Sequence, residues 1–278
     1  MRIGLIAGGG QFPIIFCKAA KSKGFEIYAA AYHKETDSVL ADFVDEIQWF
    51  YLGQVNRLIK YFKENNVNEA VMMGTIKKIR MFSNFRPDAK AVSLLAKIKH
   101  THDDKLLSAF AQLLEEEGIR VRAATFLLPS LLAQEGCWTK KKPSKSEWND
   151  IHLGWHIAKE IGRLDIGQCI VIGGGSVLAV EAIDGTDATI KRGGALGKGN
   201  AVVIKVCKPT QDQRFDIPAI GSKTIQIMHE SDVKALAIEA GKAVVFDKDE
   251  MIKNADKYGI SIVALKNDDV KDNLIIHK

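Results

Sequence analysis

The sequence predicts an α/β protein with two domains: an N-terminal Rossmann-like, doubly wound domain and a second, C-terminal α/β domain. The chain opens with a strand, a glycine loop, a helix and a second strand, which is how a doubly wound fold begins. Its 278 residues are enough for two hydrophobic cores. A polar, lysine-rich stretch separates two sets of strands and helices. We therefore expect domains at 1–135 and 150–278, joined by a linker at 136–149.

The N-terminal half follows this pattern closely. Apolar runs predict strands at 2–7, 26–32, 69–74 and 120–126, and helical periodicity predicts helices at 12–23, 54–65 and 103–117. The glycine loop precedes a helix N-terminus, which is a ready anion site, so we expect Gly8, Gly10, Gln11 and Phe12 to bind substrate. A plain tight turn is the alternative. Pro13 replaces the third small residue of the dinucleotide fingerprint, and no acid ends the second strand, so NAD is not expected.

The C-terminal half alternates in the same way. We expect a helix at 150–164, strands at 177–183 and 201–206, a helix from 223, short strands at 235–239 and 243–246, a helix at 249–257 and a last strand at 260–265. Lys208-Pro209 stops the strand at 201–206, because proline cannot donate to a sheet.

Two charged stretches follow strands of this second half. The first begins with Glu181, inside the predicted strand at 177–183, and continues after it with Asp184, Thr186, Asp187, Lys191 and Arg192; Thr186 or Asp187 is the expected helix cap. The second contains Lys205, Lys208, Asp212, Arg214 and Asp216. Charged loops at strand ends are where α/β proteins build sites. Cations suit phosphates and carboxylates suit a hard divalent metal. A solvated loop with an internal Arg–Asp pair is the alternative.

Composition limits the function classes. The chain is 46% hydrophobic and 26% charged, as in soluble globular proteins. No run reaches the roughly 18 apolar residues of a membrane span, and we expect no signal peptide. The four cysteines are widely separated, which indicates reduced thiols in the cytosol. The net charge of +5 permits contact with anionic lipid, but no nucleic-acid-binding module is recognisable.

One basic stretch suits a membrane surface. Between Lys77 and Lys99 stand seven cations against one acid, interrupted by Met81, Phe82 and Phe85. Basic residues interleaved with apolar ones are typical of interfacial binding. A solvated helix pair with aromatic residues in its core is the alternative.

Several longer motifs resemble one family. They are Gly4–Pro13 (GLIAGGGQFP), Leu164–Gln168 (LDIGQ), Ala179–Asp187 (AVEAIDGTD), Lys208–Pro218 (KPTQDQRFDIP), Glu239–Gly241 and Asn254–Asp256. In this order they resemble the UDP-2,3-diacylglucosamine diphosphatase family of lipid A biosynthesis, in its two-domain form without a metallophosphoesterase fold. The sequence departs from the family at His102, where a glycine usually precedes the two aspartates, and the segment 77–99 does not match.

The resemblance implies hydrolysis of the diphosphate of UDP-2,3-diacylglucosamine to UMP and 2,3-diacylglucosamine 1-phosphate, with Mg²⁺, or Mn²⁺, as cofactor. It makes Asp216 the first choice for the essential carboxylate. The expected catalytic residues are Asp216, Asp187, Asp212 and Arg214; the expected metal ligands are Asp216, Asp184 and Glu181; and the expected substrate contacts include Thr186, Lys191, Arg192, Lys205 and Lys208.

The expected partners are this lipid nucleotide, the cytoplasmic membrane surface and a second copy of the chain. The expected location is the cytoplasm, with peripheral association at the inner membrane. A non-catalytic nucleotide-sugar-binding module is the alternative function. A sugar or lipid kinase is disfavoured, because the sequence has no Walker A pattern and no kinase signature.

Overall fold

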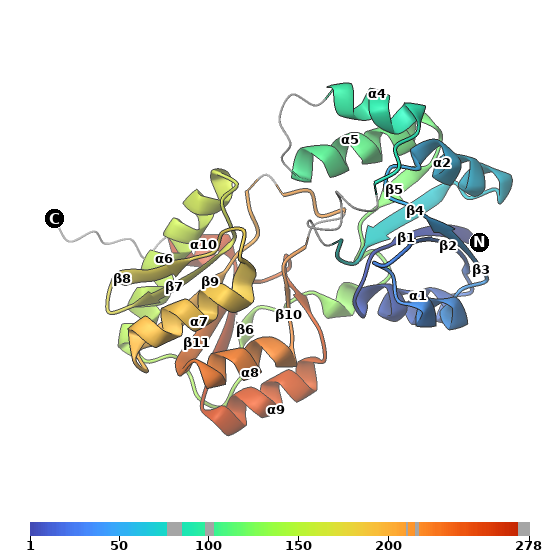
Figure 1. Ribbon diagram of the computed structural model, residues 1–278. Coiled ribbons are helices and arrows are strands. Elements are labelled where there is room, and N and C mark those ends of the chain that lie inside the picture. The colour runs from blue at the N-terminus through green and yellow to red at the C-terminus, as the bar shows by residue number, and fades with distance from the viewer. Residues whose placement is uncertain (77–84, 98–102, 210, 215–216, 272–278) are drawn as a thin grey trace. The chain divides into compact units, whose positions relative to one another are not determined.

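The computed structural model describes residues 1–76, 85–97, 103–209, 211–214 and 217–271. These residues divide into two compact units (Figure 1). The first unit is Met1–Pro129 and the second begins at Ser130, with residues 212–214 grouped with the first. Each unit has its own sheet and its own core.

The first unit is built on a five-stranded parallel sheet of order β3-β2-β1-β4-β5. Its strands are β1 (Arg2–Ala7), β2 (Glu26–Tyr32), β3 (Glu46–Phe50), β4 (Glu69–Met73) and β5 (Arg120–Arg122). Its helices are α1 (Phe12–Ser22), η1 (Ser38–Phe43), α2 (Val55–Glu64), α4 (Ala89–Lys97) and α5 (Asp103–Glu116). The strand order reverses between β1 and β4, which makes their carboxyl ends the topological switch point of a doubly wound sheet.

Helices cover both faces of this first sheet (Figure 1). The apolar stripe of α2, including Leu58 and Phe62, packs with α5 residues Ala111 and Leu114 over one face. The opposite face is covered by α1, which buries Phe16, Cys17 and Ala20. The strands are therefore buried on both sides, as their nearly continuous apolar sequences predict.

The second unit is built on a six-stranded mixed sheet of order β6-β13-β11-β9-β7-β8. Its strands are β6 (Gly136–Cys137), β7 (Cys169–Gly173), β8 (Ser176–Val180), β9 (Ala201–Lys205), β11 (Val233–Glu239) and β13 (Ser261–Leu265), with β10 (Ala219–Ile220) and β12 (Val244–Val245) as a separate pair. Its helices are α6 (Lys145–Arg163), α7 (Gly185–Gly197), α8 (Ser222–Glu230), α9 (Lys248–Tyr258) and α10 (Asn267–Lys271); the short turn η2 (Pro129–Leu131) lies at the boundary.

Two apolar layers enclose this second sheet. One layer packs α7, α8 and α9 on one face (Figure 1), with Ile190, Met228 and Met251 fully buried. The other packs Ile151 and Trp155 of α6 against alternate residues of β7, β9 and β11. The predicted fold class, an α/β protein with a doubly wound parallel sheet and a second α/β unit, is confirmed. Among the described residues, no helix is long and apolar enough to cross a membrane.

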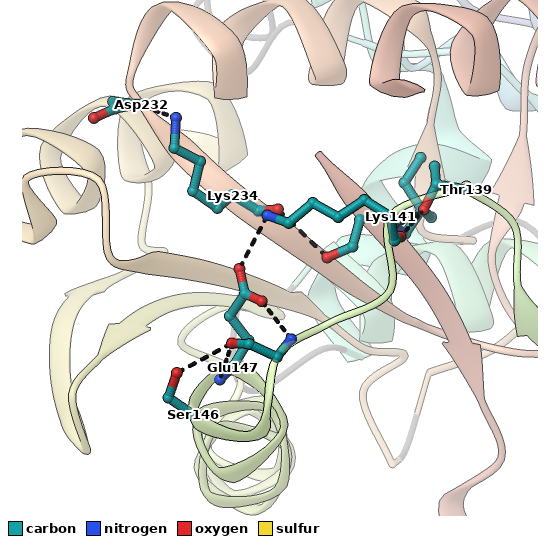
Figure 2. A network of polar contacts seen from close by, with 9 residues as sticks. Thr139, Lys141, Ser146, Glu147, Asp232 and Lys234 are labelled. Carbon is teal, nitrogen blue, oxygen red and sulfur yellow. Dashed lines mark hydrogen bonds and ion pairs between the residues drawn. The ribbon is translucent and has the colours of Figure 1, made fainter. Parts of the chain in front are cut away.

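Residues 136–149, which we expect to be a linker from the sequence, are grouped with the second unit. Gly136 and Cys137 form β6, which pairs antiparallel with β13. The hydroxyl of Thr139 accepts the backbone N–H of Ile262 at 2.9 Å and donates to the carbonyl of Lys141 at 2.8 Å (Figure 2). The polar residues that resemble a linker in the sequence therefore satisfy backbone groups at the edge of the second sheet.

The same polar stretch also starts α6. Ser144 accepts the backbone N–H of Glu147 at 3.3 Å, and Glu147 accepts the backbone N–H of Ser144 at 2.6 Å, which is a capping box. Lys141 donates to the same carboxylate at 3.4 Å (Figure 2). The helix therefore begins five residues before the predicted Asp150, because its first turn is polar and carries no apolar periodicity.

Candidate functional site

The glycine loop of the first unit lies at the switch point between β1 and β4. Gly8 donates its N–H to the carbonyl of Met73 at 2.8 Å, and Gly9 and Thr75 exchange two backbone hydrogen bonds of 2.8 and 3.0 Å. A Cβ on Gly8 would lie 2.7 Å from the backbone of Gly74, so the two loops approach too closely for a side chain. The two loops can approach this closely because each carries a glycine at the point of contact.

The predicted binding residues of this loop stand at the start of α1. Gly10 has a φ of +94°, in the left-handed region, and Gln11 is the N-cap residue without a side-chain cap hydrogen bond. Phe12 and Pro13 begin the helix. The loop thus presents helix N-terminal amides at the place where doubly wound sheets bind ligands, which suits an anion.

In the second unit, most of the predicted charged residues follow strands that run in one direction. Strand β9 is parallel to β11 and β13, and antiparallel to β7, which is in turn antiparallel to β8. The carboxyl ends of β8, β9, β11 and β13 therefore meet at one edge of the sheet. Glu181, Lys205 and Glu239 lie at or directly after three of these ends.

A continuous set of polar contacts runs along this edge, and we call it the carboxyl-edge network. Its members are Lys159, Asp165, Gln168, Glu181, Thr186, Cys207, Lys208, Gln211 and Glu239. The two ends of the network differ in character. Glu181 and its partners form one end, and the buried pair of Lys159 and Glu239 forms the other.

Glu181 is 8% exposed and accepts two hydrogen bonds. The backbone N–H of Gln168 donates to it at 3.1 Å, and the hydroxyl of Thr186 donates at 2.8 Å. The predicted capping role of Thr186 is therefore wrong: the N-cap position of α7 is Asp184, and no side-chain cap hydrogen bond is made there. Thr186 instead orients a buried carboxylate.

The side-chain amide of Gln211 connects this carboxylate region to Lys208. Its Nε2 donates to the Oε1 of Gln168 at 3.3 Å, and its Oε1 accepts the N–H of Lys208 at 2.9 Å. The ammonium of Lys208 donates to Asp165 at 2.6 Å. Lys205 is 8% exposed and donates to the carbonyl of Ala219 at 2.9 Å. Both predicted cations thus lie at the carboxyl edge.

The residues predicted on and before α7 form ion pairs of their own. Arg192 pairs with Asp184 and donates to the carbonyl of Val180 at 2.9 Å. Asp187 lies 2.6 Å from the ammonium of Lys223. Lys191 is exposed. These contacts use α7 and α8 and, in the described structure, include no residue of the carboxyl-edge network.

Asp212 and Arg214 form a pair in the segment grouped with the first unit. The guanidinium of Arg214 donates to the carboxylate of Asp212 at 2.7 to 3.0 Å and to Glu115 of α5 at 2.9 Å. Burial acts to raise the pKa of Asp212, but hydrogen bonds from the Arg214 side chain and N–H outweigh it and lower that pKa. The expected Arg–Asp pair is present, and it also contacts a helix 99 residues away in sequence.

Asp216, the first choice for the essential carboxylate, lies outside the described residues, as do Lys77, Lys78 and Arg80 of the basic stretch.

The predicted metal ligands do not assemble among the described residues. Asp184 is engaged by Arg192, and Glu181 by two hydrogen-bond donors. Within the described ranges, no group of three His, Cys, Asp or Glu side chains could hold a metal ion. Asp216, the third predicted ligand, lies outside the described residues, and we derive no catalytic step through a metal.

Sequence reasoning missed six of the nine members of the carboxyl-edge network as site residues: Lys159, Asp165, Gln168, Cys207, Gln211 and Glu239. Asp165 and Gln168 lie in the quoted motif Leu164–Gln168, Gln211 in the motif after β9 and Glu239 in the motif Glu239–Gly241. The motifs were therefore a usable signal. Lys159 gave no such signal, because in the sequence it looks like any solvent-exposed lysine of a helix.

The molecule described so far is a two-unit α/β protein with a glycine loop at one switch point and a polar network at one carboxyl edge. It belongs to the LpxI family, since the LpxI N-terminal domain matches residues 2–131 and the LpxI C-terminal domain matches residues 134–263. The boundary between these matches lies close to the structural boundary at Pro129 and Ser130.

Two curated proteins show the extent of the similarity. The UDP-2,3-diacylglucosamine pyrophosphatase LpxI of Caulobacter vibrioides is 29% identical over 275 residues, which cover 95% of this chain and 97% of that protein. The bifunctional purine biosynthesis protein PurH of Bacillus cytotoxicus is 25% identical over 154 residues, or 54% of this chain and 25% of that protein. A solved N5-carboxyaminoimidazole ribonucleotide synthetase covers 62% of this chain and 32% of its own at 16% identity, with a TM-score of 0.28.

Proposed function

We propose that this protein hydrolyses the diphosphate of UDP-2,3-diacylglucosamine to UMP and 2,3-diacylglucosamine 1-phosphate in lipid A biosynthesis. One observation carries the proposal: the similarity to the Caulobacter vibrioides pyrophosphatase extends over nearly the full length of both chains. The match therefore extends over both units, rather than over a single shared nucleotide-binding fold.

The described residues supply two features that this reaction needs. A glycine loop at a helix N-terminus suits a phosphate, and Lys205 and Lys208 place positive charge at the carboxyl edge of the second sheet. Cations stabilise the charge that develops on the phosphoryl oxygens in the transition state.

The chemical step transfers one phosphoryl group to water. The water oxygen attacks one phosphorus, the bond from that phosphorus to the bridging oxygen breaks, and a carboxylate accepts the proton of the water. We assign the carboxylate role to Asp216, with Asp187 and Asp212 as the other candidates. Arg214 is proposed to contact the phosphates.

Three further statements belong to the proposal. We propose a dependence on Mg²⁺ or Mn²⁺, with Asp216, Asp184 and Glu181 as the ligands. We also propose that the protein acts at the cytoplasmic face of the inner membrane, because its proposed substrate carries two acyl chains. A homodimer is proposed as its assembly.

The test is release of UMP from detergent-dispersed UDP-2,3-diacylglucosamine by the purified protein. We expect UMP and the sugar 1-phosphate in equal amounts. Substrate binding without product, measured by calorimetry on the same sample, would instead identify a non-catalytic nucleotide-sugar-binding module. Parallel reactions with Mg²⁺, with Mn²⁺ and with excess EDTA test the cofactor: equal rates in all three reject the metal and leave the hydrolysis standing.

A further inference from the structure

Glu239 is a carboxylate buried at the end of a central strand of the second sheet. It is the last residue of the central strand β11 and is 1% exposed. Burying an ionised group is costly unless cations and hydrogen-bond donors surround it. The partners of Glu239 therefore indicate what the side chain does.

Three groups surround this carboxylate. The ammonium of Lys159, from α6, lies 2.5 Å from it, the backbone N–H of Cys207 donates to it at 2.9 Å, and the ammonium of Lys242 lies 3.0 Å away. Burial acts to raise the pKa of Glu239, but the hydrogen bonds and charges of these partners outweigh it and lower that pKa. The group is thus held ionised inside the protein.

Lys159 and Glu239 both hold the backbone of Cys207. While Glu239 accepts the N–H of Cys207, Lys159 donates to the carbonyl of the same residue at 2.8 Å. Strand β9 ends at Lys205, and the N–H of Val206 donates to the carbonyl of Gln168 at 3.0 Å. Cys207 is therefore the first residue after β9 whose backbone polar groups are satisfied by side chains of an ion pair.

Cys207 leads directly into the turn that carries Lys208. The Cys207 thiol donates to the Oε1 of Gln211 at 3.0 Å, and the same oxygen accepts the N–H of Lys208. Through this turn the ion pair is connected to the Lys208 ammonium beside Asp165. A pair that only stabilised the sheet edge would need no contact with both backbone groups of one loop residue.

We infer that Glu239 and Lys159 are positioning residues: they hold the backbone of Cys207, and through it they fix where Lys208 stands at the carboxyl edge. This inference rests on the proposed hydrolysis, in which Lys208 faces the diphosphate. A displacement of about 1 Å at such a cation lowers the rate by roughly 10²-fold, because the charge no longer meets the transition state. Substrate affinity, to which many other groups contribute, changes little.

Lys159→Met tests the inference, with Lys242→Met as its matched control. Both substitutions remove one cation from the same carboxylate, but of the two lysines it is Lys159 that donates to the carbonyl of Cys207. For Lys159→Met we expect kcat for UMP release to fall by about 10- to 100-fold at nearly unchanged KM. For Lys242→Met we expect kcat within about twofold of wild type. Equal losses in the two variants would overturn the inference.

The double variant Lys159→Met/Glu239→Gln separates positioning from stability. It removes both charges of the pair, whereas Lys159→Met leaves the buried Glu239 carboxylate with Lys242 alone of its two cations, so the double variant should unfold at a higher temperature than Lys159→Met. Its kcat should nevertheless stay low, because no group donates to the carbonyl of Cys207. Recovery of kcat together with the unfolding temperature would show that the pair is only structural.

Hydrogen exchange tests the positioning of the turn independently of the proposed function. In wild type the Cys207 amide should exchange slowly, and in Lys159→Met and in the double variant it should exchange at least about tenfold faster, with Lys242→Met like wild type. If wild type releases no UMP but shows this exchange pattern, the hydrolysis is refuted and the positioning of the turn stands. Unchanged exchange at Cys207 in Lys159→Met refutes the positioning.

Discussion

At the scale of single residues, the candidate carboxylates differ in their hydrogen-bond and ion-pair partners. Glu181 accepts two hydrogen bonds inside the second unit, and Asp212 is held by Arg214. Asp187 pairs with Lys223, whose side chain is 81% exposed. An ion pair this exposed contributes only about 0–1 kcal/mol. Asp187 can therefore be neutralised with little effect on folding, which makes it a useful comparison for Asp216.

Asp216→Asn is expected to remove most turnover, on the order of 10²- to 10⁴-fold for a general base, with the protein still folded. The neighbouring Arg214 favours an ionised carboxylate in this segment, and asparagine cannot accept the proton. UMP release, substrate affinity and thermal unfolding are measured together, with Asp187→Asn and Asp212→Asn as comparisons. Near-normal turnover of Asp216→Asn would transfer the role to whichever comparison variant is inactive.

At the scale of elements, one carboxylate connects three helices of the first unit. Glu117 follows α5, lies 2.5 Å from Lys63 of α2, and pairs with Lys90 of α4. Hydrogen bonds from Lys63 and Lys90 lower the pKa of Glu117 to about 2 from an ordinary 4.5. Since the folded state holds the ionised form more strongly, these contacts stabilise the fold above the ordinary pKa and are lost as the pH falls toward 2.

Glu117→Gln should therefore be less stable than wild type near neutral pH, and the difference should shrink below about pH 4.5 and vanish near pH 2. Urea unfolding at a series of pH values measures it. The control is Glu116→Gln, whose side chain accepts only from Gln112 among the hydrogen bonds described here. A Glu117→Gln deficit that is constant with pH would mean that lost packing, rather than charge, is responsible.

The capping box of α6 provides a second test at this scale. Ser144→Ala removes the acceptor for the Glu147 N–H and should lower the free energy of unfolding by about 1 kcal/mol. Ser146→Ala is the matched control, since that hydroxyl contacts only the Ser144 hydroxyl in the described network (Figure 2), and we expect a change within about 0.5 kcal/mol. Equal losses in both variants would argue against the cap as the cause.

At the scale of the whole molecule, we propose the membrane surface as a partner. We expect the triple variant Lys77→Ala/Lys78→Ala/Arg80→Ala to bind anionic vesicles more weakly while turning over detergent-dispersed substrate normally, because each basic residue near such a surface contributes about 1 kcal/mol. Sedimentation with phosphatidylglycerol vesicles measures the binding.

The control for this vesicle experiment removes the same charge elsewhere. Lys140, Lys142 and Lys145 are exposed lysines of the second unit, and their replacement by alanine lowers the net charge equally. Equal weakening by both triple variants would indicate a general charge effect, and no weakening by the first would reject the basic stretch as a membrane contact.

The sequence by itself determined most elements, the fold class and the family. Apolar runs and helical periodicity depend on neighbours a few residues apart, so strands such as β1 and helices such as α2 were predictable. Motif order identified the family before any contact was known. The glycine loop was likewise visible, since Gly8 and Gly10 stand together in sequence.

Only the tertiary structure decided which charged groups meet. Lys159 and Glu239 are 80 residues apart and become partners because α6 covers the strand neighbouring β11, while Gly8 and Gly74 meet because β1 and β4 are adjacent. It also decided that residues 136–149 are folded, since the Thr139 hydroxyl accepts the N–H of Ile262 on a strand more than 100 residues away. Such contacts depend on strand order, and local sequence patterns carry no information about which strands become neighbours.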